Sequence, residues 1–206
     1  GSAQTTAPGD DPLTEGTTTL ESMTAAAMRV VSADPDGFFL MIEGGAVDWA
    51  EHANQCGRMI EEYQSFDRAV SHVQQTLDAG AGDDSRPNWS NTLVIVTADH
   101  DHLLLGAHAD TIAFEPLNDH GKGAVPGHLW LSNSHTNRLV PLYARGAGAA
   151  ELLARADEFD RAQVNGQERG RGAYLQQPEV GEVIKKFLST PATAAAPTTP
   201  GARSQE

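Results

Sequence analysis

Two short apolar runs, each followed at once by acidic and histidine residues, set the main constraint on how this chain can fold. They cover residues 38–42 (FFLMI) and 92–97 (TLVIVT). Turn-forming residues bound both runs, a pattern typical of strands buried on both faces. Between them, from Asp48 onward, apolar residues recur at three- and four-residue steps, as in an amphipathic helix. Strand, helix and strand in this order predict a βαβ unit of a parallel sheet.

Further helices and a third strand complete the expected secondary structure. The capping box Thr18-x-x-Glu21 marks the start of the first helix. Pro141 in the third strand favours a sheet edge or the first ladder position, because proline has no N–H to donate. The expected helices cover residues 18–32, about 48–80 and 179–189, and the third strand covers 139–144.

Composition divides the chain into a folded part and two flanking segments. Residues 1–16 are rich in Thr, Gly, Asp and Pro and are interpreted as a linker or tag. The Ala/Thr/Pro-rich residues 190–206 are expected to be disordered. Residues 103–134 show little periodicity and are interpreted as a long loop or insertion within a folded unit at 17–189.

The net charge restricts the class of partner. Fourteen Lys and Arg against 28 Asp and Glu give a formal net charge of −14. A nucleic-acid-binding chain needs a basic face, so no nucleic-acid partner is expected. No apolar stretch approaches the roughly 18 residues that a membrane helix requires, so no membrane association is expected either.

The residues after the two runs are of the types that bind metals. Asp48 and His52 are one helical turn apart and therefore share a face, although Asp48 could instead be a helix cap and His52 a surface residue. Asp99 and His100 follow the second run directly, where a strand that breaks into a loop can turn both side chains to one pocket. The alternative is a capped turn with a stray histidine. His102 could be a ligand, a solvated side chain or, as we favour, a group that holds a ligand carboxylate in place.

Two further candidates extend this set. Glu43 follows the first run directly and precedes two glycines. It could be a metal ligand or an exposed glutamate at the end of a strand. His135 lies shortly before the third strand and is a weak candidate when taken alone. Trp49, next to Asp48, could form a pocket wall or pack in the core. Carboxylates and imidazoles together suit zinc, an oxygen-only position suits magnesium, and such sites mostly perform hydrolysis or phosphoryl transfer.

These motifs resemble those of the alkaline phosphatase family. The resemblance runs from about residue 12 to 188. It implies an α/β fold, part of a three-layer α/β/α sandwich around a mainly parallel sheet, of which residues 17–189 would be the C-terminal half. The residues that carry the resemblance are 37–45 (GFFLMIEGG), 47–54 (VDWAEHAN), 94–100 (VIVTADH), 134–136 (SHT) and 140–146 (VPLYARG).

The resemblance also implies roles for individual residues. Trp49 stands where the family has a variable residue near bound phosphate, and His102 matches a histidine that supports a ligand. The implied ligands are Asp48, His52 and His135 for one zinc, Asp99 and His100 for a second zinc, and Glu43 for magnesium.

For the intact enzyme, the resemblance implies hydrolysis of phosphate monoesters through two zinc ions, one magnesium ion and a serine nucleophile. The half of the family fold that carries this serine does not appear in the sequence, so the isolated chain is expected to be inactive. The expected partners are a phosphate monoester or inorganic phosphate, the missing N-terminal half or a partner chain, and a second copy in a homodimer. The implied location is periplasmic or secreted.

Two other readings remain open. Phosphodiesterases and phosphomutases of the same superfamily share the Asp-x-x-x-His and Asp-His pairs, although Glu43 favours the phosphatase because it adds a magnesium ligand. The chain could also be a non-catalytic fragment that acts as a binding or assembly subunit. The exposed flank of a halved sheet would be an edge prone to association.

Overall fold

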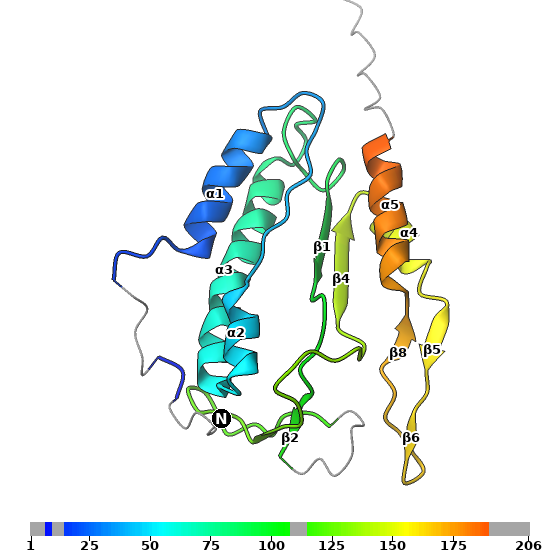
Figure 1. Cartoon of the computed structure of the whole chain (residues 1–206). Coiled ribbons are helices and arrows are strands. Elements are labelled where there is room, and N and C mark those ends of the chain that lie inside the picture. Colours follow the sequence, from blue (N-terminus) through cyan, green and yellow to red (C-terminus); the bar gives the residue numbers. More distant parts are fainter. Residues whose placement is uncertain (1–6, 10–14, 108–114, 190–206) are drawn as a thin grey trace, which may run out of the picture.

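A computed structural model describes residues 7–9, 15–107 and 115–189 of the chain (Figure 1). Of the expected flanking segments, 1–16 lies mostly, and 190–206 entirely, outside the described residues. The helices are α1 Leu20–Val31, α2 Ala46–His52, α3 Cys56–Ala79, α4 Ala149–Leu153 and α5 Gln177–Ser189. The strands are β1 Leu93–Thr97, β2 Leu104–Gly106, β3 His128–Trp130, β4 Leu142–Gly146, β5 Glu158–Asp160, β6 Gln163–Val164, β7 Gln167–Glu168 and β8 Gly172–Tyr174.

Helices flank a central pair of strands. In Figure 1 the β1–β4 pair runs between α1 and α3 on one side and α4 and α5 on the other. This arrangement of helices and strands is that of an α/β fold, as expected. None of the helices in the described part of the chain is both long and apolar enough to cross a lipid bilayer.

The first helix begins slightly later than expected. Its N-cap is Thr19, whose hydroxyl accepts a hydrogen bond from the backbone N–H of Ser22 at 3.1 Å. The expected cap at Thr18 is therefore wrong by one residue. Either threonine has the hydroxyl that an N-cap requires. In both cases Glu21 lies in the first turn, where its negative charge interacts favourably with the positive end of the helix dipole.

The long helical segment is two helices rather than one. α2 and α3 are separated at Asn54, whose φ of 54° turns the chain out of the helical path. Asparagine tolerates this left-handed conformation better than most residues do. Cys56 and Leu77 on the predicted apolar stripe of α3 are fully buried, but Tyr63 on the same stripe is 46% exposed.

The first apolar run does not form a strand in the described structure. Residues 38–42 form neither a helix nor a strand and belong to no ladder, and Phe39 and Met41 are 60% and 76% exposed. The prediction of a strand buried on both faces is therefore wrong for this run. The expected parallel pairing is also missing, since all four ladders among the described residues are antiparallel.

The second run and the third strand pair with each other. β1 lies within the predicted range, and it is antiparallel to β4, with Leu93 opposite Gly146 and Thr97 opposite Leu142. β4 begins after Pro141 rather than at residue 139. Pro141 thus lies outside the ladder, and its carbonyl accepts a hydrogen bond from the Thr97 hydroxyl at 3.0 Å.

A second short ladder lies further along the same hairpin, whose two arms are the segments β1–β2 and β3–β4. β2 follows β1 along the chain, β3 precedes β4, and β2 and β3 are antiparallel, with Leu104 opposite Trp130. The two ladders are therefore two parts of one interrupted hairpin. The segment 103–134, expected as a loop or insertion, contributes the tip of this hairpin, although residues 108–114 lie outside the described part.

Two apolar contacts hold this hairpin to the helices. On one side, Ala50, Cys56 and Met59 form a buried cluster against which Leu104 and Trp130 pack, so that α2 and α3 are anchored to the hairpin. On the other side, α4 packs against β4 and α5. Gly148, the N-cap residue before α4, has a φ of 80°, and a Cβ there would fall 2.1 Å from the ring of Phe187 in α5, so this position requires glycine.

Candidate metal centre

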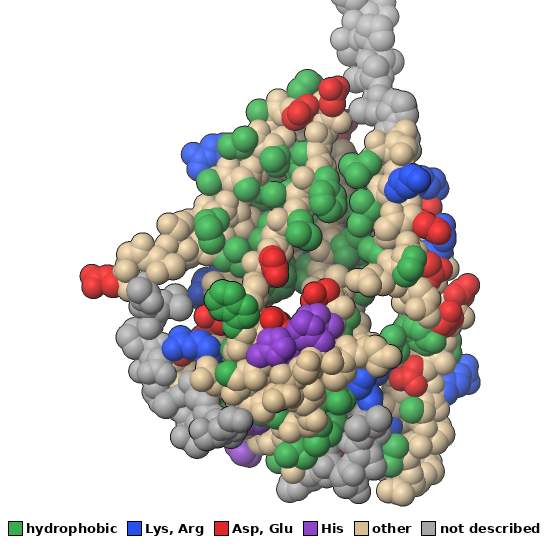
Figure 2. Space-filling view, viewed as in Figure 1, with side chains coloured by type: hydrophobic (Ala, Val, Ile, Leu, Met, Phe, Trp, Pro, Cys, Tyr) green, Lys and Arg blue, Asp and Glu red, His purple; other side chains and the backbone are tan. Residues whose placement is uncertain are grey.

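Asp48, His52, His102 and His135 converge at the interruption of the hairpin. One donor atom of each lies within 4.8 Å of the others. The first two come from α2, His102 from the β1–β2 arm and His135 from the β3–β4 arm. Figure 2 shows histidine and acidic side chains gathered at one edge of an exposed apolar area. The structure therefore joins three segments that are distant in the sequence.

The carboxylate of Asp48 is the point on which the imidazoles converge. Its Oδ1 lies 2.8 Å from Nε2 of His102 and 3.2 Å from Nε2 of His135. The Nε2 atom of His100 is 3.7 Å from the same oxygen. The short contact with His102 is a hydrogen bond that an ionised carboxylate can only accept, so His102 donates through Nε2.

His52 is oriented so that it offers a lone pair to the group. Its Nδ1 lies 2.9 Å from the backbone carbonyl of Asn133 and donates to it, because a carbonyl cannot donate. In neutral imidazole this leaves Nε2 unprotonated. That atom faces Nε2 of His135 at 3.0 Å and Oδ2 of Asp48 at 3.5 Å. A backbone carbonyl that fixes the tautomer in this way is typical of a metal-binding histidine.

The geometry fits a zinc ion. Donor atoms about 2.0–2.1 Å from a tetrahedral zinc lie about 3.3 Å from one another. Nε2 of His52 lies 3.0 Å from Nε2 of His135, and the Asp48 carboxylate approaches them with different oxygens, Oδ1 3.2 Å from His135 and Oδ2 3.5 Å from His52. One carboxylate and two imidazoles are also a usual zinc donor set. His102, at hydrogen-bond distance from Asp48, fits the predicted role of holding this carboxylate in place.

The surroundings of the group favour the protonation states that a cation needs. Burial tends to raise the pKa of Asp48, but the hydrogen bond from His102 and the neighbouring histidines outweigh it, so the pKa lies below its ordinary value. Burial lowers the pKa of His102, against the opposing effect of Asp48. The pair is therefore an ionised carboxylate held by a neutral imidazole at neutral pH.

Glu51 is a member of this region for which the sequence pattern predicts no role. It lies on α2 beside His52, and its Oε2 is 3.8 Å from Nε2 of His102. Burial, followed by the charges of Asp101 and Asp48, raises its pKa to about 7. Its position in the helix carries no special spacing, so only the packing of α2 against the hairpin shows that this carboxyl group is enclosed.

Replacing Glu51 with glutamine should change how stability depends on pH. A carboxyl group whose folded pKa is raised stabilises the fold below its unfolded value near 4.5 and loses that contribution as pH rises to about 7. We therefore expect the melting temperature of Glu51→Gln, relative to wild type, to be higher at pH 8 than at pH 4. Thermal melts with a chelator present would measure this. Glu21→Gln, at an exposed site on α1, is the control, and equal shifts in both variants would contradict the prediction.

Three predicted site residues lie at the margin of the group or outside it. The side chain of Asp99 is 80% exposed and reaches His100, with 3.5 Å between Oδ2 and Nε2. The carboxylate of Glu43 is exposed and lies beside Gly45. Trp49 is 76% exposed, so it packs in no core. The His100 ring, in contrast, stacks on that of His135, with 3.5 Å between the ring centroids.

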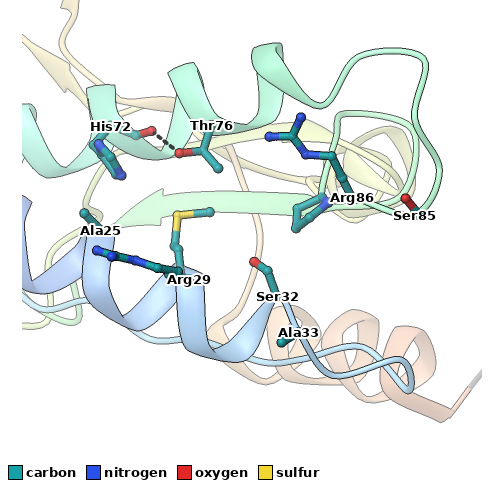
Figure 3. A pocket seen from close by; sticks show the side chains of 10 residues that line it. Ala25, Arg29, Ser32, Ala33, His72, Thr76, Ser85 and Arg86 are labelled. Atoms are coloured by element: carbon teal, nitrogen blue, oxygen red, sulfur yellow. Dashed lines mark hydrogen bonds between the residues drawn. The ribbon is translucent and has the colours of Figure 1, made fainter.

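A surface pocket of about 400 Å³ lies elsewhere, between α1, α3 and the loop after α3 (Figure 3). Arg29, His72 and Arg86 are among the side chains that line it. The two arginines have a structural explanation, because Arg29 lies in the last turn of α1 and Arg86 donates to the carbonyl of Ala79 at the end of α3. Cations are favoured at helix C-termini, which repel anions, so this pocket is a weaker candidate than the histidine group.

The sequence is similar to those of known alkaline phosphatases. The family model "Alkaline phosphatase" matches residues 10–181. Alkaline phosphatase H of Pseudomonas aeruginosa is 41% identical over 152 residues, which are 69% of this chain and 29% of that protein. The alkaline phosphatase of Escherichia fergusonii is 36% identical over 151 residues, 69% of this chain and 30% of that protein. The chain thus spans about 30% of the length of these relatives.

Solved structures of the same family also match. Alkaline phosphatase from the Antarctic bacterium TAB5 is 31% identical and covers 64% of this chain, which covers 35% of it, with a TM-score of 0.45. A mutant of that enzyme, with a TM-score of 0.46, has Mg bound in a site named M3. On the strength of the family model and the curated relatives, this chain belongs to the alkaline phosphatase family.

Proposed function

We propose that this chain is the metal-binding part of an alkaline phosphatase that hydrolyses phosphate monoesters. The observation that carries the proposal is the convergence of the Asp48 carboxylate and the imidazoles of His52 and His135 at donor-to-donor distances suited to zinc. Membership of the alkaline phosphatase family supports the same reaction class.

Within this proposal, the chain supplies ligands for three ions. Asp48, His52 and His135 hold the first zinc, and His102 keeps the Asp48 carboxylate in position. Asp99 and His100 hold a second zinc, and the stacking of His100 on His135 supports a position close to the first site. Glu43 supplies a carboxylate to magnesium. Trp49, exposed next to Asp48, lies near the phosphoester.

The division of labour follows from the chemistry of these residues. Bound zinc supplies Lewis-acid stabilisation of negative charge on the attacking and leaving oxygens of phosphoryl transfer. The residues of this chain orient the donor atoms, as the Asn133 carbonyl does when it accepts from Nδ1 of His52 and leaves Nε2 facing the site. The serine nucleophile belongs to a part of the enzyme outside this sequence. That part also supplies the remaining ligands of the second zinc, held by Asp99 and His100, and of the magnesium held by Glu43. The isolated chain is accordingly inactive.

The partners follow from the same proposal. They are a phosphate monoester or inorganic phosphate, the remainder of the enzyme, and a second copy in a homodimer. The location proposed for the enzyme is periplasmic or secreted.

The proposal is tested by metal binding and activity together. Native mass spectrometry of the chain with Zn²⁺ should show weak zinc occupancy, since each shell is only partly present and the ligands order on binding. Hydrolysis of p-nitrophenyl phosphate with Zn²⁺ and Mg²⁺ should be negligible until the rest of the enzyme is supplied. Rapid hydrolysis by the isolated chain would contradict the proposal. Faster cleavage of a diester than of a monoester by the reconstituted enzyme would instead favour a phosphodiesterase.

A further inference from the structure

We propose that Asp101 and Thr136 form a clamp that positions the histidines on the two arms of the hairpin for metal binding. This inference rests on the function proposed above and assigns positioning residues to the same site. Neither residue belongs to the group of converging donor atoms, so both would act through the histidines that flank them in the sequence.

The clamp consists of three hydrogen bonds. The hydroxyl of Thr136 donates to Oδ2 of Asp101 at 2.9 Å, and the backbone N–H of Thr136 donates to the carbonyl of Asp101 at 2.7 Å. The same Oδ2 accepts from the backbone N–H of Leu103 at 2.7 Å. Side chain and backbone of Asp101 are thus both bound to the opposite arm, and its carboxylate is also bound to its own arm.

The position of the clamp in the hairpin explains why it is needed. The β1–β4 ladder ends where Thr97 lies opposite Leu142, and the next pairing is the isolated bridge between Asp101 and Thr136. From one pairing to the next, the first arm advances four positions (Thr97 to Asp101) and the second arm six (Thr136 to Leu142), so the regular register is lost. The ladder alone therefore does not fix how His100 and His102 face His135. The bridge restores a defined alignment one residue away from each of these three histidines.

The clamp also supports an unusual backbone conformation. Leu103 has a φ of 54°, which is rare for a residue with a bulky side chain. The hydrogen bond from its N–H to Asp101 and the one from Leu131 to its carbonyl, at 3.1 Å, hold this turn in place. The turn comes directly after His102. This histidine is 2% exposed and hydrogen-bonds to Asp48. The carboxylate of Asp101 therefore controls the entry of His102 into the site as well as the alignment of the arms.

Paired substitutions at Thr136 separate positioning from packing. Thr136→Val keeps the shape and the backbone bridge but removes the hydroxyl, whereas Thr136→Ser keeps the hydroxyl. Zn²⁺ affinity, measured by competition with a chromophoric chelator, should fall about 10- to 100-fold in Thr136→Val, the range seen when a group that orients a ligand is lost. It should stay within about threefold of wild type in Thr136→Ser. The visible absorption of bound Co²⁺ should weaken in the valine variant alone, because its ligands are less well oriented.

Asp101→Asn tests the other side of the clamp and guards against a folding defect at Thr136. An amide oxygen still accepts both hydrogen bonds, so this variant should bind Zn²⁺ within about threefold of wild type. A loss as large as that of Asp101→Ala would mean that Asp101 acts as a charged ligand and would overturn the clamp. So would wild-type affinity in Thr136→Val, or equal losses in the valine and serine variants.

The outcome for wild type distinguishes the two proposals. If wild-type chain binds no Zn²⁺, the proposed function fails and the clamp fails with it. If wild type binds Zn²⁺ and Asp48→Ala does not, while Thr136→Val binds normally, the function stands and the clamp alone is wrong.

Discussion

Replacing Asp48 with alanine should lower the affinity of the chain for Zn²⁺ by more than about 100-fold. Loss of a group that only orients a ligand costs up to about 100-fold, and Asp48 is the shared partner of the group, so its loss should cost more. Its Oδ1 faces nitrogens of His102 and His135 at 2.8 and 3.2 Å. Competition titration with a chromophoric chelator measures the effect.

Two further variants make the Asp48 experiment specific. Asp67→Ala removes an exposed carboxylate from α3 and leaves the site untouched, so its affinity should equal that of wild type. Asp48→Asn keeps an acceptor for His102 but removes the charge, so it should bind Zn²⁺ more weakly than wild type while melting closer to it than Asp48→Ala does. Unchanged zinc binding in Asp48→Ala would mean that the ion is held elsewhere.

Replacing Leu152 with alanine should destabilise the fold by about 2–5 kcal/mol. Leu152 on α4 is fully buried, and α4 packs against β4 and α5. Shortening the side chain removes apolar contacts and leaves a cavity that the flanking elements cannot fill completely. Urea denaturation followed by circular dichroism measures the free energy of unfolding.

The neighbouring leucine provides a matched control. Leu153 on the same helix is 55% exposed, so Leu153→Ala changes the same side chain with the same helix propensity but little burial. Its effect should stay below about 1 kcal/mol. Equal destabilisation by the two substitutions would show that helix formation, rather than packing against β4 and α5, determines the loss.

The sequence predicted best those elements whose stability is local. α1, α5 and β1 lie close to their expected ranges because caps, apolar periodicity and β-branched residues act over a few neighbouring residues. The run at 38–42 failed for the opposite reason. Its apolar character indicates a buried strand, but a strand needs partners, and none pairs with it among the described residues. Phe39 and Met41 are consequently exposed.

The candidate site was predicted in outline rather than in geometry. Asp48 and His52 could be paired from their helical spacing alone, and the structure brings them together with His135. Contacts between residues that are distant in the sequence produce no such spacing pattern. Neither the enclosed carboxyl group of Glu51 nor the pairing of Asp101 with Thr136 follows any local period, because both depend on how α2 and two hairpin arms meet.

Insertions and deletions should have different effects at different positions of the interrupted hairpin. Between β2 and β3, inserted or deleted residues would extend or shorten a tip whose ends are already joined by a ladder, so the histidines on the arms would keep their spacing. Between Thr97 and Asp101 a single deleted residue would pull the Asp101–Thr136 bridge out of place and shift His100 and His102 relative to His135. Homologous chains should accordingly vary freely in length at the tip and hardly at all in the arms.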